Sequence, residues 1–135
     1  MGEVDDTASL LATVPGGREL LSWFSGVPNF GDAEVIALHL DRAKPSTLLL
    51  EVPSRSGVAI VTLELGDWID VRIRGFSRQN VIDGLVLRRG GERELAPWEI
   101  GVGAKPGEIE IELKPIFGAY GVIRATLLSV AMQTA

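Results

Sequence analysis

The sequence predicts a mainly β protein, an antiparallel β-sandwich or curved barrel-like sheet of about seven strands with one short N-terminal helix. Two observations support this fold class. Seven runs rich in aliphatic and β-branched residues follow one another from residue 34 onward, and most are separated by short turns containing Gly, Pro, Ser or Asp. Most of these connections are too short for the crossover helix that parallel strands require, so antiparallel pairing is expected.

The length and composition favour one domain. The 135 residues suffice for a single hydrophobic core, and the 46% hydrophobic content is too high for a disordered chain. No internal repeat or low-complexity tract divides the chain. We expect a flexible acidic tail over residues 1–7 and a single β-rich domain over residues 8–135.

The expected helix precedes the strands. Three apolar residues recur at the three-to-four spacing of a helical face, namely Leu20, Leu21 and Phe24. This spacing predicts a helix over residues 17–25, which Gly26 then ends.

The strands are predicted from the β-rich runs themselves. In chain order the runs cover residues 34–42, 47–52, 58–65, 68–76, 81–89, 107–115 and 120–133. A turn at Gly66 and Asp67 is expected to separate the third run from the fourth. The irregular segment over residues 91–107 is longer than an ordinary hairpin loop, which makes it a candidate functional loop.

Strict alternation marks two of the runs as strands with one buried and one wet face. In the fourth run Ile69, Val71 and Ile73 alternate with three charged residues, and in the sixth Ile109 and Ile111 alternate with glutamates. The charged side chains should therefore gather on the outside of the sheet.

The composition removes several classes of site. The chain has no cysteine, which excludes disulfides, iron–sulfur clusters, thiolate metal sites and cysteine nucleophiles. Its net charge of −5 argues against a nucleic-acid partner, because binding to phosphates needs a positive field. Charges interrupt every apolar run and the N-terminus is acidic, so we expect a cytoplasmic protein without a membrane span or secretory signal.

The single histidine, His39, does not define a catalytic site. Metal sites usually gather several ligands, and no serine occupies the Gly-x-Ser-x-Gly elbow that exposes a nucleophile. The glycine-rich segment 101–107 lacks the spacing of a phosphate-binding loop. We therefore expect no catalytic residue, no metal and no cofactor, and we interpret His39 as a structural or surface residue.

Carboxylates leave one enzymatic alternative open. Asp32 with Glu34, and Asp67 with Asp70, are local acidic clusters, and a pair of carboxylates in different environments can perform general acid–base hydrolysis. A competing interpretation assigns Asp32 to the turn before the first strand, where its side chain would bond nearby backbone amides.

The arginines are the most unevenly distributed residues. Six of the ten fall within 22 residues, namely Arg72, Arg74, Arg78, Arg88, Arg89 and Arg93. One interpretation pairs them with glutamates on neighbouring strands or with Asp83, and the other presents them to an acidic partner. For the second interpretation the candidate contact residues are Arg72, Arg74, Arg78 and Arg88, together with Trp98 in the long loop, because tryptophan often anchors protein interfaces.

Three segments, taken in order, resemble the immunity protein 50 family of bacterial polymorphic-toxin systems. They are LSWFSGVPNFGDAEVIALHLDR (21–42), GFSRQNVIDGLVLRR (75–89) and IELKPIFGAYGVIRATLLSVAMQ (111–133). The shared features are a short helix ending in Trp-Phe, an entry into the first strand and a strand boundary. The motif residues in this chain are Phe30, Asp32, Glu34, Gln79 and Asn80.

The resemblance implies a non-enzymatic protein that binds a cognate toxin and blocks it. Members of the family often carry histidine where this chain has Gly31, so any role of that imidazole is lost here and the chain resembles a divergent member. Within this resemblance Phe30 is expected to anchor the core. The acidic net charge would suit a basic toxin.

Two other possibilities concern ligands and assembly. A small-ligand-binding barrel or sandwich would need a cavity of about 300 Å³ or more with a few convergent polar groups. A homodimer could form through the long final strand if its edge is exposed.

Overall fold

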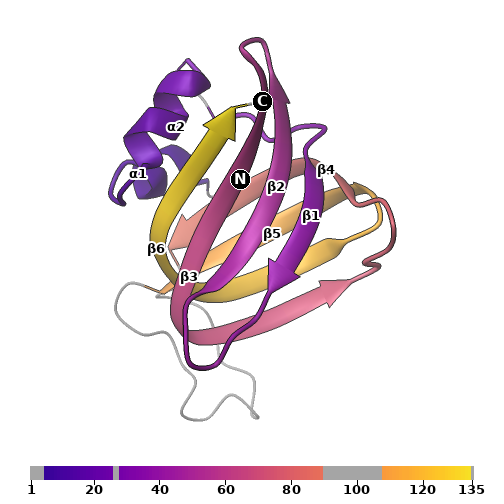
Figure 1. Cartoon of the computed structure of the whole chain (residues 1–135). Helices are drawn as coiled ribbons and strands as arrows, with labels where there is room; N and C mark the ends of the chain where they lie inside the picture. Colours follow the sequence, from indigo (N-terminus) through magenta and orange to yellow (C-terminus); the bar gives the residue numbers. More distant parts are fainter. Residues whose placement is uncertain (1–4, 26–27, 90–107, 135) are drawn as a thin grey trace.

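The strands form one closed antiparallel barrel (Figure 1). The computed structural model describes residues 5–25, 28–89 and 108–134, apart from the side chains of residues 67 and 68. Around the barrel the strands follow the order β1-β2-β3-β6-β5-β4. Their bounds are β1 (Glu34–His39), β2 (Ser46–Ser54), β3 (Gly57–Arg74), β4 (Val81–Arg89), β5 (Glu108–Phe117) and β6 (Tyr120–Thr134). The predicted fold class, a mainly β protein with a curved antiparallel sheet, is confirmed.

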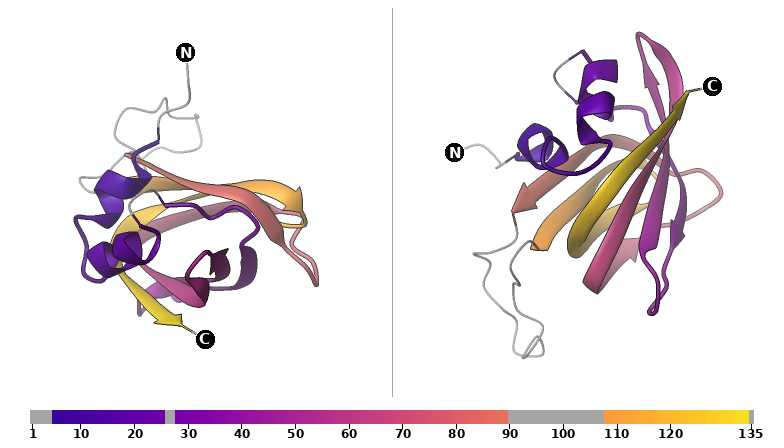
Figure 2. Two further views of the ribbon diagram at one scale, coloured as in Figure 1. Left: turned by 90° about the horizontal axis from the view of Figure 1, so that it is seen from above. Right: turned by 60° about the vertical axis from the view of Figure 1, so that its left-hand side comes forward.

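Two long strands, β3 and β6, extend through both halves of the barrel, the half that contains β1 and β2 and the half that contains β4 and β5. The first part of β3 pairs with β2 and with the end of β6, whereas its last part pairs with the beginning of β6. The beginning of β6 also pairs with β5. The two strands therefore curve from one half of the barrel into the other, as Figures 1 and 2 show.

The expected turn at Gly66 and Asp67 does not form, because the two predicted strands on either side of it join into the 18-residue β3. The pairing register shifts between Gly66 and Asp70, which is where the long strand curves. A Cβ atom at Gly66 would lie 2.6 Å from the side chain of Leu128 on β6. The glycine here permits close packing in a curved strand and does not reverse the chain.

The barrel closes through a short seam between β1 and β4. Glu34 lies opposite Val81, and the amide of Val35 donates to the carbonyl of Asn80 at 2.8 Å. Next to it the amide of Ile82 donates to the carbonyl of Ala33 at 2.9 Å. Closure therefore depends on the few residues that follow the Asn29–Asp32 turn.

Two short helices cover one side of the barrel, where one was expected (Figure 2). The predicted helix is α2 (Gly17–Trp23), and an additional helix, α1 (Thr7–Leu11), precedes it. The connection between them bonds β6, since the amide of Val130 donates to the carbonyl of Pro15 at 2.9 Å.

The last residues of the expected acidic tail belong to the folded domain. The amide of Asp6 donates to the carbonyl of Leu87 at 2.8 Å, and the amide of Leu87 donates to the hydroxyl of Thr7 at 2.9 Å. Thr7 is buried as a result. Residues 1–4 lie outside the described chain, so the prediction of a flexible tail is corrected for Asp6 and Thr7 only.

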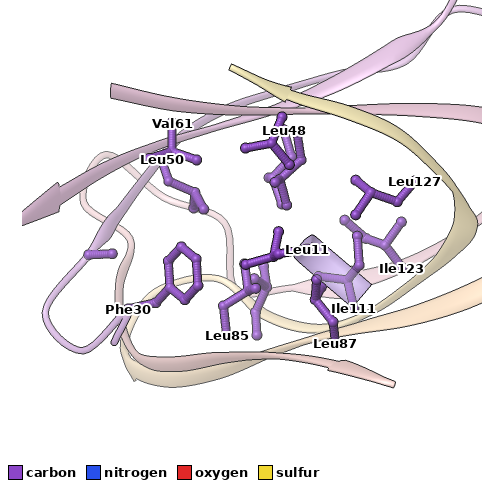
Figure 3. Close-up of a cluster of buried hydrophobic side chains, with 14 of the residues drawn as sticks. Leu11, Phe30, Leu48, Leu50, Val61, Leu85, Leu87, Ile111, Ile123 and Leu127 are labelled. Atoms are coloured by element: carbon purple, nitrogen blue, oxygen red, sulfur yellow. The ribbon is translucent and has the colours of Figure 1, made fainter. Parts of the chain in front are cut away.

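The core lies between the two halves of the barrel and the helices. Figure 3 shows side chains from all of these parts pointing toward one another. Fully buried members include Leu11, Leu20, Leu48, Leu50, Leu63, Leu65, Ile82, Leu87, Ile111 and Ile123. The core extends from α1 to the strands, so the helices complete the hydrophobic interior.

The predicted alternation of faces is confirmed for β3 and β5. Ile109 and Ile111 are buried, whereas Ile69, Val71 and Ile73 are partly buried and pack against the core. In β1 a bulge at Ile36 shifts the register, so that Leu38 packs against the core and His39 is exposed.

Candidate functional site

Two of the candidate arginines lie in a network of ion pairs on the outside of the barrel. Arg88 on β4 contacts Glu112 at 2.8 Å and Glu110 at 3.5 Å on β5. Arg72 on β3 contacts Asp70 of the same strand at 3.1 Å. The expected pairing of arginines with glutamates on a neighbouring strand is confirmed for Arg88.

A third arginine, Arg124 on β6, links these pairs into one belt. Its guanidinium contacts Glu110 on β5 at 3.2 Å and Asp70 on β3 at 3.2 Å. Sequence reasoning missed this residue, because Arg124 lies far along the chain from the arginine-rich stretch. We call Asp70, Arg72, Arg88, Glu110, Glu112 and Arg124 the charge belt.

The charge belt perturbs the ionisation of Arg88. Burial opposes its charged form, but the hydrogen bond and the negative charge of Glu112, assisted by Glu110, outweigh that effect and raise the pKa of Arg88. The side chain of Arg88 is only 17% exposed, and that of Arg124 is 18% exposed. The belt thus ties four strands together and leaves little of these two guanidinium groups for a partner.

The other two candidate arginines in the described chain, Arg74 and Arg78, are exposed and form no ion pair with a described residue. Arg74 ends β3, and Arg78 lies in the connection from β3 to β4. They therefore differ from Arg72 and Arg88 in being available for contact.

Large apolar side chains are also exposed in the segment that holds these two arginines and in the hairpin that adjoins it. Phe76 and Ile116 are each 55% exposed, Phe117 is 59% exposed and Tyr120 is 43% exposed. They come from the β3–β4 connection and from the end of the β5–β6 hairpin, both on the right of the barrel in Figure 1. We call Arg74, Phe76, Arg78, Ile116, Phe117 and Tyr120 the hairpin-end patch.

Strand pairing brings the parts of the hairpin-end patch together. Arg74 lies opposite Tyr120 in the β3–β6 register. At Gly75 a Cβ atom would lie 3.3 Å from the ring of Tyr120, so the start of the β3–β4 connection touches the hairpin. On the other side Val81 at the start of β4 lies opposite Phe117.

Asn80 fixes the two connections to each other. It is 2% exposed, and its side-chain oxygen accepts hydrogen bonds from the amides of Ser77 at 2.8 Å and Ala119 at 3.0 Å. Its amide nitrogen donates to the carbonyl of Ser77 at 2.9 Å. The hairpin-end patch is therefore built on a hydrogen-bonded frame whose centre is one of the motif residues.

Glycine allows the hairpin to approach this frame. Gly118 has φ of +86°, and a Cβ atom there would lie 2.4 Å from the carbonyl oxygen of Gln79. Gln79 itself is exposed, and its backbone bonds the Ser77 hydroxyl. Among the motif residues, Asn80 thus has the central structural role at this end.

The other motif residues lie near the β1–β4 seam. Phe30 is buried, as expected, and its ring centroid is 5.1 Å from that of Phe24. Asp32 does not brace the turn with its side chain, because Asn29 accepts the hydrogen bond from the amide of Gly31 at 2.9 Å. Asp32 instead shapes the turn through its backbone. It adopts a positive φ of 65°, and its amide donates to the carbonyl of Ile82 on β4. Glu34 begins β1 and is partly buried.

Several candidates lie outside the described residues. Trp98 and the expected loop over residues 91–107 are among them, as are Arg93 and the side chain of Asp67.

The apolar members of the hairpin-end patch were missed by sequence reasoning. Ile116 is the extra residue of a bulge, because Val81 and Ile82 on β4 lie opposite Phe117 and Pro115. A bulge turns a side chain out of the regular alternation, and the sequence Lys-Pro-Ile-Phe-Gly was its only signal.

The described residues contain no group of three or more His, Asp or Glu side chains that could hold a metal ion. Among the described residues, two carboxyl groups have lowered pKa values. Hydrogen bonds from the hydroxyl and amide of Thr7 lower the pKa of Asp5, and amides of Ala43 and Lys44 lower that of Asp41.

At least two pockets among the described residues open at the surface. One of about 290 Å³ lies beside the β1–β2 turn, and one of about 490 Å³ lies between α2 and the β2–β3 hairpin. Neither is the core cavity lined by Leu, Ile and Val that a ligand-binding barrel was expected to have.

No family model, curated protein or solved structure matches this chain. The resemblance to the immunity protein 50 family therefore stays a prediction.

Within the described residues, no helix has both the length and the apolar character needed to cross a membrane.

Proposed function

We propose that this chain is a non-enzymatic protein-binding domain whose partner docks on the hairpin-end patch. One observation carries the proposal. Four large apolar side chains, between 43% and 59% exposed, and two arginines that form no ion pair with a described residue come from two adjoining segments, residues 74–78 and 116–120. Single exposed apolar residues are common, but a group of them at one end of a fold marks an interaction site.

The composition of the patch fits the centre of a protein interface. Aromatic residues and arginine are enriched at such centres, and they provide most of the binding free energy in many complexes. The frame around Asn80 holds both connections in place before binding, so little conformational entropy is lost on docking.

The positive charge of the patch indicates the charge expected on the docking face of the partner. Arg74 and Arg78 place two positive charges on a protein whose net charge is −5. We therefore propose that the docking face of the partner is apolar at its centre and carries carboxylates around it, since complementary charge steers association and fixes orientation.

The resemblance to the immunity protein 50 family supplies the class of partner. On that basis the partner is a bacterial toxin domain, and binding neutralises it by covering a surface that the toxin needs. The competing occupant of the patch is a second copy of this chain, which would also bury the aromatic side chains.

Calorimetry tests this proposal on the purified chain. The titrant is the C-terminal domain of the protein encoded beside this chain's gene. We expect a one-to-one complex with nanomolar affinity. The double variant Arg74→Glu/Arg78→Glu and the variant Phe117→Ser should each weaken binding by about tenfold or more, the effect typical of residues at an interface centre.

Arg55→Glu is the matched control, because Arg55 is also exposed and forms no ion pair with a described residue. It lies on the β2–β3 hairpin, away from the patch, and should bind as the wild type does. Absence of binding to the neighbouring toxin domain, or equal binding by the patch variants and the wild type, would contradict the proposal. Sedimentation of the isolated chain tests for the competing homodimer. If the chain dimerises through the patch, the variant Phe117→Ser should sediment as a monomer.

A further inference from the structure

A groove lies between the end of α2 and the tip of the β2–β3 hairpin, and none of its described lining residues belongs to the hairpin-end patch. Its volume is about 490 Å³, which is in the range of small-molecule sites. The residues that line it are Trp23, Phe24, Ser25, Asn29, Pro53, Ser54, Arg55 and Ser56. In Figure 1 the hairpin rises above the barrel beside α2.

One wall of the groove is aromatic and held in place. The rings of Trp23 and Phe24 meet edge to face with their centroids 5.2 Å apart. Phe24 meets Phe30 in the same way at 5.1 Å, and Phe30 is buried in the core. The aromatic wall is therefore anchored to the interior and presents a preformed apolar surface.

A hydrogen bond joins the two sides of the groove. The hydroxyl of Ser56 at the hairpin tip donates to the carbonyl of Trp23 at the end of α2, at 3.3 Å. Ser25, the next lining residue, has φ of 62°, a left-handed conformation that is uncommon for residues other than glycine and is found at binding sites.

The opposite side of the groove offers hydrogen-bond donors. Arg55 forms no ion pair with any described residue. The side-chain oxygen of Asn29 already accepts a hydrogen bond from the amide of Gly31 at 2.9 Å. The NH₂ group of Asn29 is therefore the part of this side chain that we expect to bond a ligand, and it is a donor. Among the described residues, the lining includes one cation and no carboxylate side chain, although the chain as a whole has a net charge of −5.

We infer that this groove binds a small carboxylate with an aromatic body. The ring of the ligand packs on Trp23 and Phe24, and its carboxylate accepts hydrogen bonds from the guanidinium of Arg55 and the amide of Asn29. Arginine suits this role because its planar group binds a carboxylate through two parallel hydrogen bonds. A positively charged ligand would meet Arg55 without a compensating carboxylate among the described lining residues.

The test uses 3-phenylpropionate as the probe and nuclear magnetic resonance of the full chain as the readout. The signals to follow are the side-chain N–H groups of Trp23, Asn29 and Arg55. Saturable shifts of these signals are expected at a probe concentration on the order of 1 mM, the affinity that a ligand of this size reaches. The neutral analogue 3-phenyl-1-propanol has the same ring and chain length but no carboxylate, and should bind about tenfold more weakly.

Matched variants distinguish specific binding of the acid at Arg55 from nonspecific electrostatic attraction to the protein. Arg55→Gln should weaken binding of the acid by about tenfold and leave the alcohol unchanged, and Arg55→Lys should retain part of the affinity. Arg78→Gln removes one exposed positive charge at the other end and should bind the acid as the wild type does. Absence of saturable shifts, equal affinity for acid and alcohol, or an equal loss in Arg78→Gln would overturn the inference. None of these outcomes depends on a protein partner.

Discussion

The side-chain oxygen of Asn80 accepts a hydrogen bond from the backbone amide of Ala119 at 3.0 Å, although the two residues are 39 positions apart in the chain. This bond joins the β3–β4 connection to the β5–β6 turn. Because the hairpin-end patch takes its apolar side chains from both segments, the proposed binding surface depends on it.

Replacing Asn80 by Ala should destabilise the protein by about 2–4 kcal/mol, because the buried amide of Ala119 and the partly buried amide of Ser77 lose their acceptor. Urea unfolding measures the change. Gln79→Ala is the neighbouring control, since the Gln79 side chain is exposed, and should change stability by less than about 0.5 kcal/mol. Equal stabilities of the two variants would mean that Asn80 does not hold the frame.

Gly121→Ala should be severely destabilising. Gly121 has φ of +139°, and a Cβ atom there would lie 1.9 Å from the carbonyl oxygen of Arg72 on β3. The strands would have to separate, at a cost of about 3 kcal/mol or more. Gly84→Ala is the matched control, because a Cβ atom at Gly84 meets nothing within 4 Å, and its effect should stay below about 1 kcal/mol. Thermal unfolding of both variants checks this difference.

Glu34 and Glu51 lie directly opposite each other in the β1–β2 register. Like charges in this position repel, so Glu51→Lys should stabilise the protein by about 0.2–1 kcal/mol. The gain should shrink as salt is added, because screening weakens the interaction. Glu51→Gln should give a smaller gain. Urea unfolding at low and high ionic strength measures the free energy of unfolding of each variant. If the gain in stability does not depend on salt, its cause is not the charge repulsion.

The charge belt should couple its members. A double-mutant cycle with Arg124→Met and Glu110→Gln should give a coupling free energy of about 0.5–3 kcal/mol, because their side chains are only 18% and 19% exposed. The cycle of Arg72→Met with Asp70→Asn is a more exposed comparison and should give about 0.2–1 kcal/mol. Additive effects in the first cycle would show that the belt contributes no pairwise stabilisation.

Acid should remove the contribution of Asp5. Hydrogen bonds from Thr7 lower the pKa of Asp5 below its ordinary value of 3.8. Its contribution to stability is therefore fully present above pH 3.8 and is lost as the pH falls through the lower pKa of the folded state. The stability difference between the wild type and Asp5→Ala should be constant near neutral pH and decrease below that value. A difference that stays the same at every pH would contradict this origin.

The sequence predicted those features that depend on local pattern. Alternation in Ile69–Ile73 and Glu108–Glu112 identified strands and their buried faces correctly, because one face of each strand lies against the core. Such patterns report burial directly, so they can be interpreted without knowledge of the partner strands. The burial of Phe30, by contrast, was expected only from the family resemblance.

Features that depend on contacts between distant segments were not predictable. The glycine at Gly66 signals a turn by itself, and only its packing against Leu128 reveals a continuous curved strand. Helix α1 has five residues and is stabilised by Leu11 in the core and by the hydrogen bond from the amide of Leu87 on β4 to the hydroxyl of Thr7. Likewise, the sequence could not distinguish Arg88, which pairs with glutamates on β5, from Arg74, which forms no ion pair with a described residue, because pairing depends on residues of other strands.

Site-specific photo-crosslinking in the cells that produce this protein tests the central proposal most directly. Phe117, in the patch, is replaced by the photoreactive residue benzoylphenylalanine, and Val58, 39% exposed on the β2–β3 hairpin, is replaced in a control chain. We expect one defined crosslinked protein from position 117, which disappears with Arg74→Glu/Arg78→Glu and binds the purified chain in calorimetry. The same crosslinks from position 58, or none from position 117, would contradict a binding function for the hairpin-end patch.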